Sequence, residues 1–451
     1  MKRTFLYAGS SCLLVSSLCY HTARAQVTLG AQLRTRTELR DGQGAPLPQG
    51  ANPAVFTSQR SRLMAGFNST RLKVGFTAQD VRVWGQDVST INRTTTADLN
   101  GFMLYEAWAE VLLSDTARLT KTFSLKIGRQ EFVYDDSRLL GNLDWLQQGR
   151  HHDAALLKYE TPQWVLHVAG AFNQNKENAS GTVYNETPPG NYTANTNGGA
   201  AYKGLEFAYL KRKLKDGSAS FLFLADQFST FHTDSTTGLK SYGNGTFNRM
   251  TTGVYFTKSV AAFTITASAY YQFGHNASGQ TIDGELISAA LFFNPTKTFS
   301  IGPGVDYTSG GSNGHTSHAF DPLYGTPHRF WGSMDYYYVA SGFGNHGLQD
   351  YYLKTKWKPG ARWNLALDGH QFLSASNVPG AGHSYSRNFG TEADLQATYT
   401  LTKAIAFEAG YSHYWSTDAL TSATVKNVVN AKSNSNWAYL MIIIHPEVVL
   451  K

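Results

Sequence analysis

The sequence predicts an all-β protein, in which a transmembrane antiparallel β-barrel encloses an aqueous lumen. Apolar and polar residues alternate over runs of about 10–14 residues, the period of a strand with two different faces. Such runs match the ~9–11 residues with which a strand crosses a bilayer, and they exceed the mean globular strand of ~5–6. Gly (42 residues) and aromatic residues (13%) are abundant and Pro (13 residues) is scarce. This composition is typical of an outer-membrane barrel.

The first 25 residues are predicted to be a cleaved signal peptide. Lys2 and Arg3 form a basic start, an apolar segment follows, and Ala23-Arg24-Ala25 is a typical cleavage site. After this segment no run of ~18 apolar residues remains that would indicate a transmembrane helix. We therefore expect residues 26–451 to form a single outer-membrane barrel domain.

The predicted signal peptide also contains Cys12 and Cys19, the only cysteines of the chain. Its removal excludes a disulfide framework, a thiolate nucleophile and a cysteine-ligated metal. It also removes Lys2, Arg3 and Arg24 but no acid, which lowers the formal net charge of +7 by three. The mature chain is then mildly basic, which does not indicate a nucleic-acid partner.

The individual strands follow from the alternation. The first run, residues 27–40, places Val27 and Leu29 on one face and Arg34 and Arg36 on the other. We predict about eighteen strands. They start near residues 27, 56, 71, 101, 121, 151, 163, 201, 217, 248, 260, 281, 296, 347, 361, 387, 403 and 436. Sixteen is the alternative number, because residues 217–229 and 330–345 are ambiguous; the run "MDYYYVA" (334–340) is placed in a loop.

The links between the predicted strands alternate between short and long. Short links lie at 68–70, 160–163, 215–217, 294–296 and 358–361. Long links, rich in Gly, Asn, Ser and Thr, lie at 41–55, 85–100, 132–150, 174–200, 230–247, 308–346 and 417–435. Outer-membrane barrels have short periplasmic turns and longer outer loops. An even strand number then places both ends of the barrel on the periplasmic side.

One segment resembles a known family. "LKIGRQEFVYDDSRLLGNLDWLQQGRHHDAALLKY" (125–159) is similar to the hallmark segment of the alginate-export family of outer-membrane porins. The matching residues are Gly128, Arg129, Gln130, Arg138, Leu139, Gly141, Asp144, Trp145, Gln147, Gly149, Arg150 and Asp153. "FTAQDVRVWGQ" (76–86), "EAGYSH" (408–413) and "NWAYLMI" (436–442) also look like this family. The resemblance implies a monomeric barrel, typically of eighteen strands, with an arginine-rich lumen that passes an anionic polysaccharide in the best-known member. The end, "IIIHPEVVLK", departs from the pattern by lacking a terminal aromatic residue.

Cations on the early strands are the candidate lumen and substrate-binding residues. By alternation we expect inward-facing Arg34, Arg36, Arg40, Arg60, Arg62, Arg71 and Lys73, joined by Arg82, Lys126 and Arg129 unless a bulge shifts their register. Two interpretations stay open for them. They form a paired network that stiffens the wall, or their unpaired guanidinium groups bind the carboxylates of a passing solute. Asp368, Glu392, Asp394 and Glu408 on later strands also face inward, so the lumen is expected to be polarised.

The segment "YDDSRLLGNLDWLQQGRHHDA" (134–154) belongs to the third outer loop, which in such barrels can fold inward and narrow the pore. The candidate residues that pin this loop to the wall are Arg138, Asp144, Trp145, Arg150 and Asp153. Their charges would form charge-assisted hydrogen bonds, and Trp145 would anchor the loop by its contacts. Direct contact of these residues with solute is the alternative.

The predicted function is an outer-membrane channel of a diderm bacterium that passes anionic solutes, such as an acidic oligo- or polysaccharide like alginate. Its expected partners are outer-membrane lipid and the solute, and the expected state is a monomer without cofactor or metal. A structural or loop-plugged barrel is the first alternative. A barrel hydrolase is the second, but in Ser317-His318 and Ser412-His413 adjacent strand residues point to opposite faces, so no enzyme is expected.

Overall fold

The computed structural model describes residues 25–85, 102–115, 120–174, 177, 179–182, 184, 202–337 and 345–450. The predicted signal peptide, apart from Ala25, lies outside the described residues. So do most of the expected outer loops at 85–100 and 174–200 and the last three residues of the 334–340 run. The first four residues of that run lie in a loop, as predicted.

Eighteen strands of the described chain form the barrel wall. They are β1 (Gln26–Asp41), β2 (Ala54–Asn68), β3 (Leu72–Val83), β4 (Met103–Leu112), β5 (Thr122–Gln130), β6 (His152–Glu160), β7 (Trp164–Phe172), β8 (Gly204–Leu214), β9 (Gly217–Thr233), β10 (Lys240–Val260), β11 (Phe263–His275), β12 (Thr281–Thr296), β13 (Phe299–Thr308), β15 (Leu348–Gly360), β16 (Trp363–Leu373), β19 (Asn388–Thr402), β20 (Ile405–Ser416) and β21 (Asn434–Ile444). Each is antiparallel to its neighbours. The predicted all-β barrel of eighteen strands is confirmed, and the alternative of sixteen is wrong.

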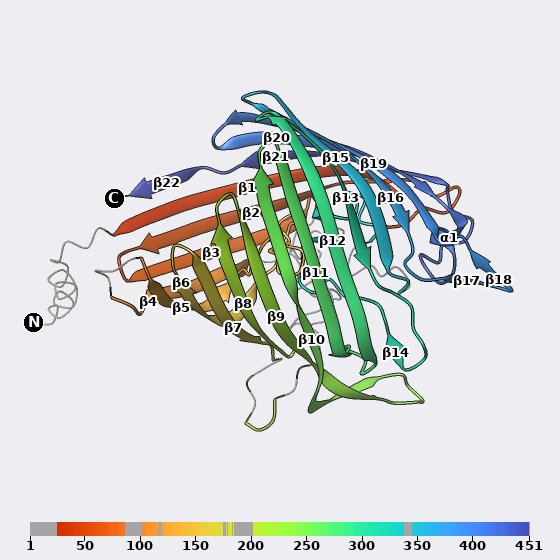
Figure 1. Ribbon diagram of the computed structural model, residues 1–451, viewed down its shortest axis with the longest axis horizontal. Coiled ribbons are helices and arrows are strands. Elements are labelled where there is room, and N and C mark those ends of the chain that lie inside the picture. The colour runs from red at the N-terminus through yellow and green to blue at the C-terminus, as the bar shows by residue number, and fades with distance from the viewer. Residues whose placement is uncertain are drawn as a thin grey trace, which may run out of the picture.

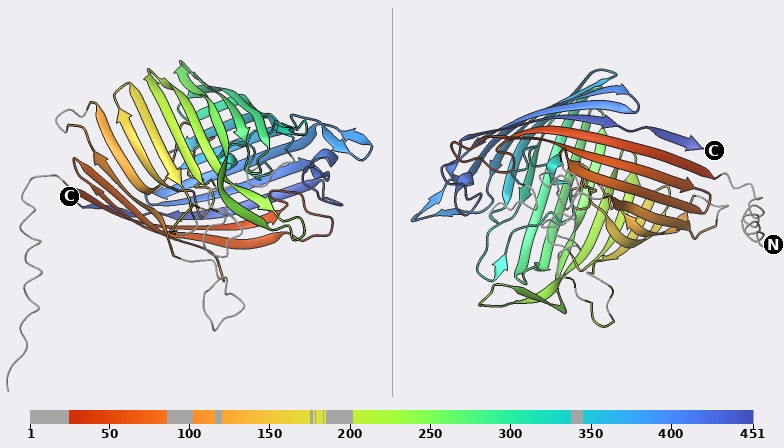
Figure 2. Two further views of the ribbon diagram at one scale, coloured as in Figure 1. Left: turned by 90° about the horizontal axis from the view of Figure 1, so that it is seen from below. Right: turned by 180° about the vertical axis from the view of Figure 1, so that it is seen from behind.

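The wall closes because β1 pairs with β2 on one side and with β21 on the other. A short strand, β22 (Glu447–Leu450), continues along β1, and β14 (Thr316–Ser317) lies parallel to β12. Figures 1 and 2 show the tilted strands side by side in a closed ring, with the start of β1 and the end of β22 at the same end. The short turns that follow β2, β6 and β8 mark the periplasmic end.

Period-two alternation explains which side chains face outward. On β11, Ile265 and Tyr271 are 43% and 46% exposed, whereas Ser268 and Gln272 face the lumen and are 5% and 0% exposed. In hydrocarbon every backbone polar group must pair within the protein, and closure of the sheet achieves this. Apolar residues are therefore displayed on the outside, where a soluble protein would bury them.

The predicted long loop at 230–247 is mostly strand. β9 and β10 remain paired as far as Thr233 and Lys240, and a register shift lies between Tyr242 and Thr246. The hairpin extends beyond its neighbours at the outer end in Figures 1 and 2. Gly-rich sequence at 243–245 indicated a loop, but in the structure it forms this irregularity within a paired ribbon.

Part of the lumen is filled by a hydrophobic core. Leu205, Phe207 and Tyr209 of β8, with Leu222 and Leu224 of β9, face inward and are almost fully buried. They contact apolar residues of two segments that enter the barrel from its outer end. Over these residues both faces of the strands are mostly apolar, which weakens the alternation that identifies a strand.

The remaining elements of the described chain are small. They are a 3-10 turn, η1 (Pro327–Arg329), a four-residue helix, α1 (Asp418–Thr421), and a hairpin of β17 (Val378–Gly380) and β18 (His383–Tyr385). Within the residues described, no helix is long and apolar enough to cross a membrane.

Candidate functional site

Residues 131–151, here named the first inner loop, leave β5 and fold into the lumen. The carboxylate of Asp144 lies among three arginines of β1 and β2. Its oxygens accept hydrogen bonds from Arg34 Nη1 at 3.1 Å and Arg60 Nη1 at 2.8 Å, and Arg62 Nη1 lies 3.8 Å away. Arg34 Nε also donates to the Gln147 side chain at 2.9 Å. The loop thus uses the inward cations of the wall as its binding site.

The charge of Asp144 is maintained by these neighbours. Burial raises the pKa of its carboxyl, but the guanidinium groups of Arg60 and Arg34 lower it more, so the net pKa is below the ordinary value. Next to it, Trp145 lies between two partners. Arg36 is 4.2 Å from its ring centroid, and the His328 ring stacks on it at 4.0 Å. Trp145 therefore anchors the loop, and it also lines a cavity of the lumen.

The other part of the first inner loop is attached across the lumen. Arg138, which is 5% exposed, donates to Asp306 of β13 at 2.6 Å and pairs with Asp136 of its own loop at 3.3 Å. Burial lowers the pKa of Arg138, but the carboxylates of Asp306 and Asp136 raise it by more than burial lowers it. The net pKa is above the ordinary value, and this buried group remains charged. The side chain of Arg150 donates to the backbone carbonyl of Gly325. The loop therefore spans the barrel.

Residues 318–337, the second inner loop, pack beside the first. Arg249 of β10 pairs with Asp321 at 2.6 Å, and the Tyr324 hydroxyl donates to Asp226 of β9 at 2.7 Å. Leu140 and Tyr324 form a backbone bridge between the two loops. At the opposite wall, two side chains of β19 accept hydrogen bonds from backbone N–H groups of this loop. Both loops are thus fixed at two or more points of the wall.

A cavity of about 480 Å³ remains between the inner loops and the wall, where residues of β10 to β13, β15, β16 and β19 to β21 line it. Arg329, Lys354 and Lys356 line it together with Tyr255 and Tyr352. Lys354 is engaged, because its Nζ lies 3.4 Å from Asp368 and 3.3 Å from the Arg329 carbonyl. Arg329 and Lys356 are exposed and form no ion pair with a carboxylate in the part of the chain that is described.

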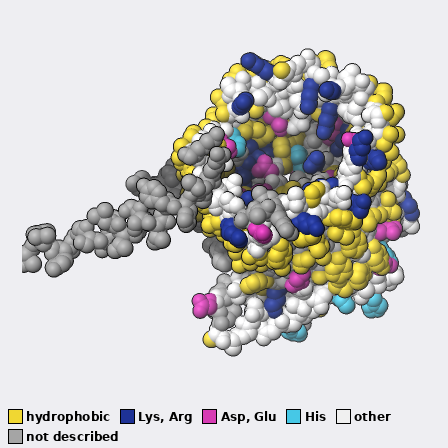
Figure 3. All heavy atoms as spheres, turned by 60° about the vertical axis from the view of Figure 1, so that its left-hand side comes forward, with side chains coloured by type: hydrophobic (Ala, Val, Ile, Leu, Met, Phe, Trp, Pro, Cys, Tyr) yellow, Lys and Arg dark blue, Asp and Glu magenta, His cyan; other side chains and the backbone are white. Residues whose placement is uncertain are grey.

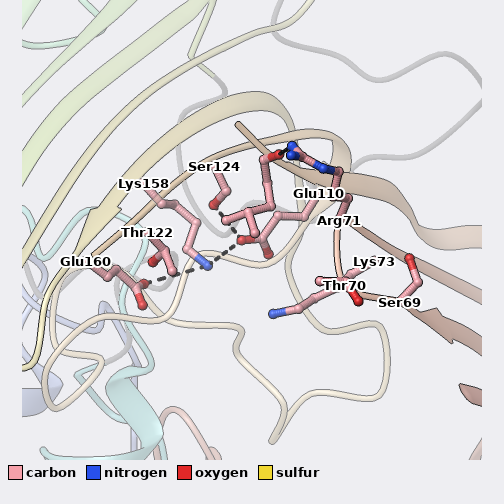
Figure 4. Close-up of a pocket in the computed structure, with 10 residues that line it drawn as sticks. Ser69, Thr70, Arg71, Lys73, Glu110, Thr122, Ser124, Lys158 and Glu160 are labelled. Carbon is pink, nitrogen blue, oxygen red and sulfur yellow. Dashed lines mark hydrogen bonds and ion pairs between the residues drawn. The ribbon is translucent and has the colours of Figure 1, made fainter. Parts of the chain in front are cut away.

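A second cavity, of about 260 Å³, lies at the periplasmic rim. Figure 4 shows Lys158 directed at Glu110 and Glu160, while the amino group of Lys73 points into the open space. Within the described residues, the side chain of Arg71 donates to the Leu112 carbonyl, at 3.4 Å. Figure 3 shows the hollow end of the barrel, with basic and acidic side chains on its inner wall and a hydrophobic band outside.

A family comparison decides where this barrel belongs. The model described as "Alginate export" matches residues 25–433, which is most of the sequence. The chain belongs to the alginate export family. This family membership and the closed barrel place the protein in the outer membrane of a Gram-negative bacterium, as a channel-forming protein of the porin type. Among curated proteins, no sequence matches the chain.

Solved outer-membrane channels share the fold of this alginate export family member. The structure of Pseudomonas aeruginosa OpdK with vanillate has a TM-score of 0.56 and 11% identity, covering 94% of this chain and 99% of that chain. Acinetobacter baumannii OccAB1 has a TM-score of 0.59 and 13% identity, covering 94% of this chain and 97% of that chain. OccAB2 of the same organism has a TM-score of 0.58 and 11% identity, covering 93% of this chain and 98% of that chain. At such identities the likeness concerns the fold.

The structure places the predicted lumen residues of this family member in three settings. Arg34, Arg36, Arg60 and Arg62 hold the first inner loop, which corresponds to the paired network rather than to free guanidinium groups. Arg40 faces inward but pairs with Glu38 at 2.9 Å. Arg71 and Lys73 line the rim cavity, and Lys126 lies inward, 3.9 Å from the centroid of the Trp108 ring.

Arg82 and Arg129 face outward, contrary to the prediction. Arg82 stands opposite Gln59 on the face of Leu63 and pairs with Asp80 at 2.6 Å. Arg129 lies on the face of Ile127, which is 54% exposed. The β2–β3 ladder and the ladders of β5 with β4 and β6 contain no register shift, so strict alternation directs both arginines away from the lumen.

Of the residues predicted to pin the loop to the wall, Asp153 does not do so, and its prediction was wrong. It is in β6, on the outward face, where its carboxylate pairs with Arg129 at 2.7 Å. Arg138, Asp144, Trp145 and Arg150 all contact the inner loops or the inward wall, as described above.

Sequence reasoning missed Lys354 and Lys356 of the central cavity. The signal was present, because "YLKTKWKPG" (352–360) places lysines at every second position of a strand. Sequence reasoning also missed Arg249 and Asp306, because the residues with which they form ion pairs are distant in sequence. No group of three His, Cys, Asp or Glu side chains suited to a metal ion occurs among the residues described.

Proposed function

We propose that this protein is a channel for small anionic solutes, which pass between the inner loops and the β15–β20 wall. The observation that carries the proposal is a set of cations that line two separate cavities of the barrel and have no carboxylate partner in the described chain. Arg329 and Lys356 line the central cavity, and Arg71 and Lys73 line the rim cavity. None of these four pairs with a carboxylate within the described chain, whereas Arg34, Arg36, Arg60 and Arg62 are occupied by the first inner loop.

The size of the cavities supports a small solute. Volumes of about 260 and 480 Å³ lie near the lower part of the ~300–1,000 Å³ range of small-molecule sites. A carboxylate with one or two rings fits this space; vanillate, present in the OpdK structure, is such a carboxylate. Passage of a polysaccharide such as alginate, which the family description suggests, would require the inner loops to leave the lumen. One chain encloses the whole route, and we expect a monomer surrounded by lipid.

Planar-bilayer recordings test the proposal. In a KCl gradient at low salt, the reversal potential of the wild-type channel should indicate a preference for chloride, because closely spaced cations raise the local anion concentration. Replacing Lys73, Arg329 and Lys356 with Gln should remove most of that preference. A control variant carries Gln at three exposed lysines of the periplasmic turns, Lys215, Lys297 and Lys403. A cation-selective wild type, or equal shifts in both variants, would refute the proposal.

The second candidate is a barrel that the loops plug, and the buried ion pairs at both loops favour it. A plugged barrel would give no current above background even when it is correctly folded. Correct folding is checked on a detergent gel, where the folded barrel migrates faster before heating than after. Uptake of vanillate and of alginate oligomers into protein-containing vesicles then separates the two sizes of solute. Uptake of the oligomers at the rate of vanillate would contradict the small-solute channel.

A further inference from the structure

Two carboxyl groups of β19 face the lumen without a lysine or arginine as counter-ion. Glu392 and Asp394 stand two positions apart, so both point inward, and they are 0% and 7% exposed. Among the described ion pairs, the basic side chain that reaches them is His370, whose Nε2 lies 4.0 Å from Asp394 Oδ2. Buried charges are normally paired, and this arrangement therefore requires an explanation.

The two carboxyl groups hold the second inner loop. The backbone N–H of Met334 donates to Glu392 Oε1 at 2.8 Å, and that of Ser333 donates to Asp394 Oδ2 at 3.2 Å. Gly332, with φ +80°, permits this approach, because a Cβ there would lie 2.4 Å from Glu392 Oε2. The attachment thus depends on close contact between the loop backbone and the acids.

The other oxygen of each carboxyl group has no hydrogen-bond donor. Glu392 Oε2 and Asp394 Oδ1 are buried and have no partner among the described residues, although the two carboxyl groups interact with each other. Two ionised carboxylates in this position would repel each other, and no donor among the described residues reaches these two oxygens to offset the repulsion. Neighbouring carboxyl groups in such sites resolve the repulsion by sharing one proton.

The groups that surround the pair do not supply this donor. His370 of β16 gives its Nδ1 to Asp350 of β15 at 2.9 Å. The hydroxyl groups of Tyr414 on β20 and Tyr337 of the loop bond to each other at 2.6 Å. Asp335 of the loop pairs with His328 at 2.8 Å. Asp335, Tyr337, Tyr414 and the Nδ1 of His370 thus have other partners, and the Nε2 of His370, 4.0 Å from Asp394 Oδ2, is beyond hydrogen-bond distance of that oxygen.

We propose that Glu392 and Asp394 share one proton and that this proton holds the second inner loop against β19. The pair then carries one negative charge in place of two. Loss of the proton at high pH brings two negative charges together beside Gly332 and drives the loop away. Because one proton links the two states, the ratio of loosened to attached loop should rise up to tenfold per pH unit once the pair titrates.

Difference infrared spectroscopy detects the shared proton directly and requires no solute. The wild-type barrel at neutral pH should show the carbonyl band of a protonated carboxylic acid that is missing in Glu392→Gln and in Asp394→Asn. Glutamine is a close mimic, since its oxygen still accepts from Met334 and its amide donates toward Asp394. Glu408→Gln is the control, because Glu408 faces the lumen but accepts hydrogen bonds from Tyr439 and Thr398. An unchanged band in both test variants would overturn the proposal.

Single-channel recordings over a pH series test the consequence, which rests on the proposed channel function. Rising pH should increase excursions to higher conductance in the wild type and in Glu408→Gln, but not in Glu392→Gln. Release of the loop by a chelator at constant pH would assign the site to a divalent cation and overturn the shared proton. A silent channel with the expected infrared band would refute the proposed function and leave the proton site standing.

Discussion

Replacing Asp144 with alanine removes the carboxylate that Arg34, Arg60 and Arg62 of the wall share. In the variant, the first inner loop keeps Trp145 between Arg36 and His328 but loses its ion pairs with β1 and β2. The loop should therefore leave the lumen more often, while the wall itself stays intact. The hydrogen bonds at 2.8 and 3.1 Å are the main losses, since the third arginine is 3.8 Å away.

The expected size follows from burial. The side chains of Arg34 and Arg60 are 5% and 1% exposed, but that of Asp144 is 49% exposed. Removing one partner of a fully buried pair costs about 3–5 kcal/mol. Solvent at the half-exposed carboxylate screens part of this, and we expect about 2–3 kcal/mol. That corresponds to a change of about 30- to 150-fold in the equilibrium between docked and undocked loop.

Single-channel recordings measure this change as the fraction of time spent at high conductance. Asp153→Ala is the matched control, because Asp153 is 51% exposed and also pairs with an arginine, but on the outward face. It should behave like the wild type. Equal behaviour of Asp144→Ala and the wild type, or equal effects of the two variants, would refute the assignment of Asp144 as the attachment point.

Three further predictions concern the loops and the wall. Because the net pKa of Asp144 lies below its ordinary value of 3.8, its ion pairs are complete above about pH 5 and are lost as pH falls below about 4, so the conductance change that is lost in Asp144→Ala should occur in that acid range. Arg138→Ala leaves Asp306 buried and unpaired, at a cost of about 3–5 kcal/mol, and should raise channel noise more than it shifts the reversal potential. Ile265→Arg on the lipid face should lower the folding free energy by about 2–4 kcal/mol near the midplane, and Thr266→Arg on the lumen face by far less; urea titrations in vesicles measure both, and equal costs would contradict the assigned faces.

The wall was predictable because alternation is local. A strand such as β11 shows its two faces in a dozen consecutive residues, and no distant contact is needed to assign it. β9 was ambiguous for a physical reason. Its inward Leu222 and Leu224 contact the inner loops instead of water, so the middle of its inward face is apolar like the lipid face, although Ser218, Ser220 and Asp226 also face inward. A filled lumen therefore removes the pattern on which the prediction depends.

The orientation of Arg129 was within reach of the sequence and was still predicted wrongly. Lys126 and Arg129 are three positions apart and therefore face opposite sides of an uninterrupted strand. The inner attachments were not within reach. Arg34 and Asp144 are 110 residues apart, and no local pattern determines that they meet. The hydrogen bond between Met334 and Glu392 was also out of reach, because it is determined by the place at which the second inner loop enters the lumen.

The two inner loops connect parts of the wall that have no strand pairing in common. The first joins β1 and β2 to β13, and the second joins β9 and β10 to β19. A single-layer cylinder resists stretching along its circumference but bends easily, so that lateral pressure can flatten its cross-section. The loops act as spokes of a wheel, with ion pairs and charged hydrogen bonds at their ends. Flattening this barrel in any direction that crosses a spoke means breaking those bonds first, so the shape of the cross-section is held from within.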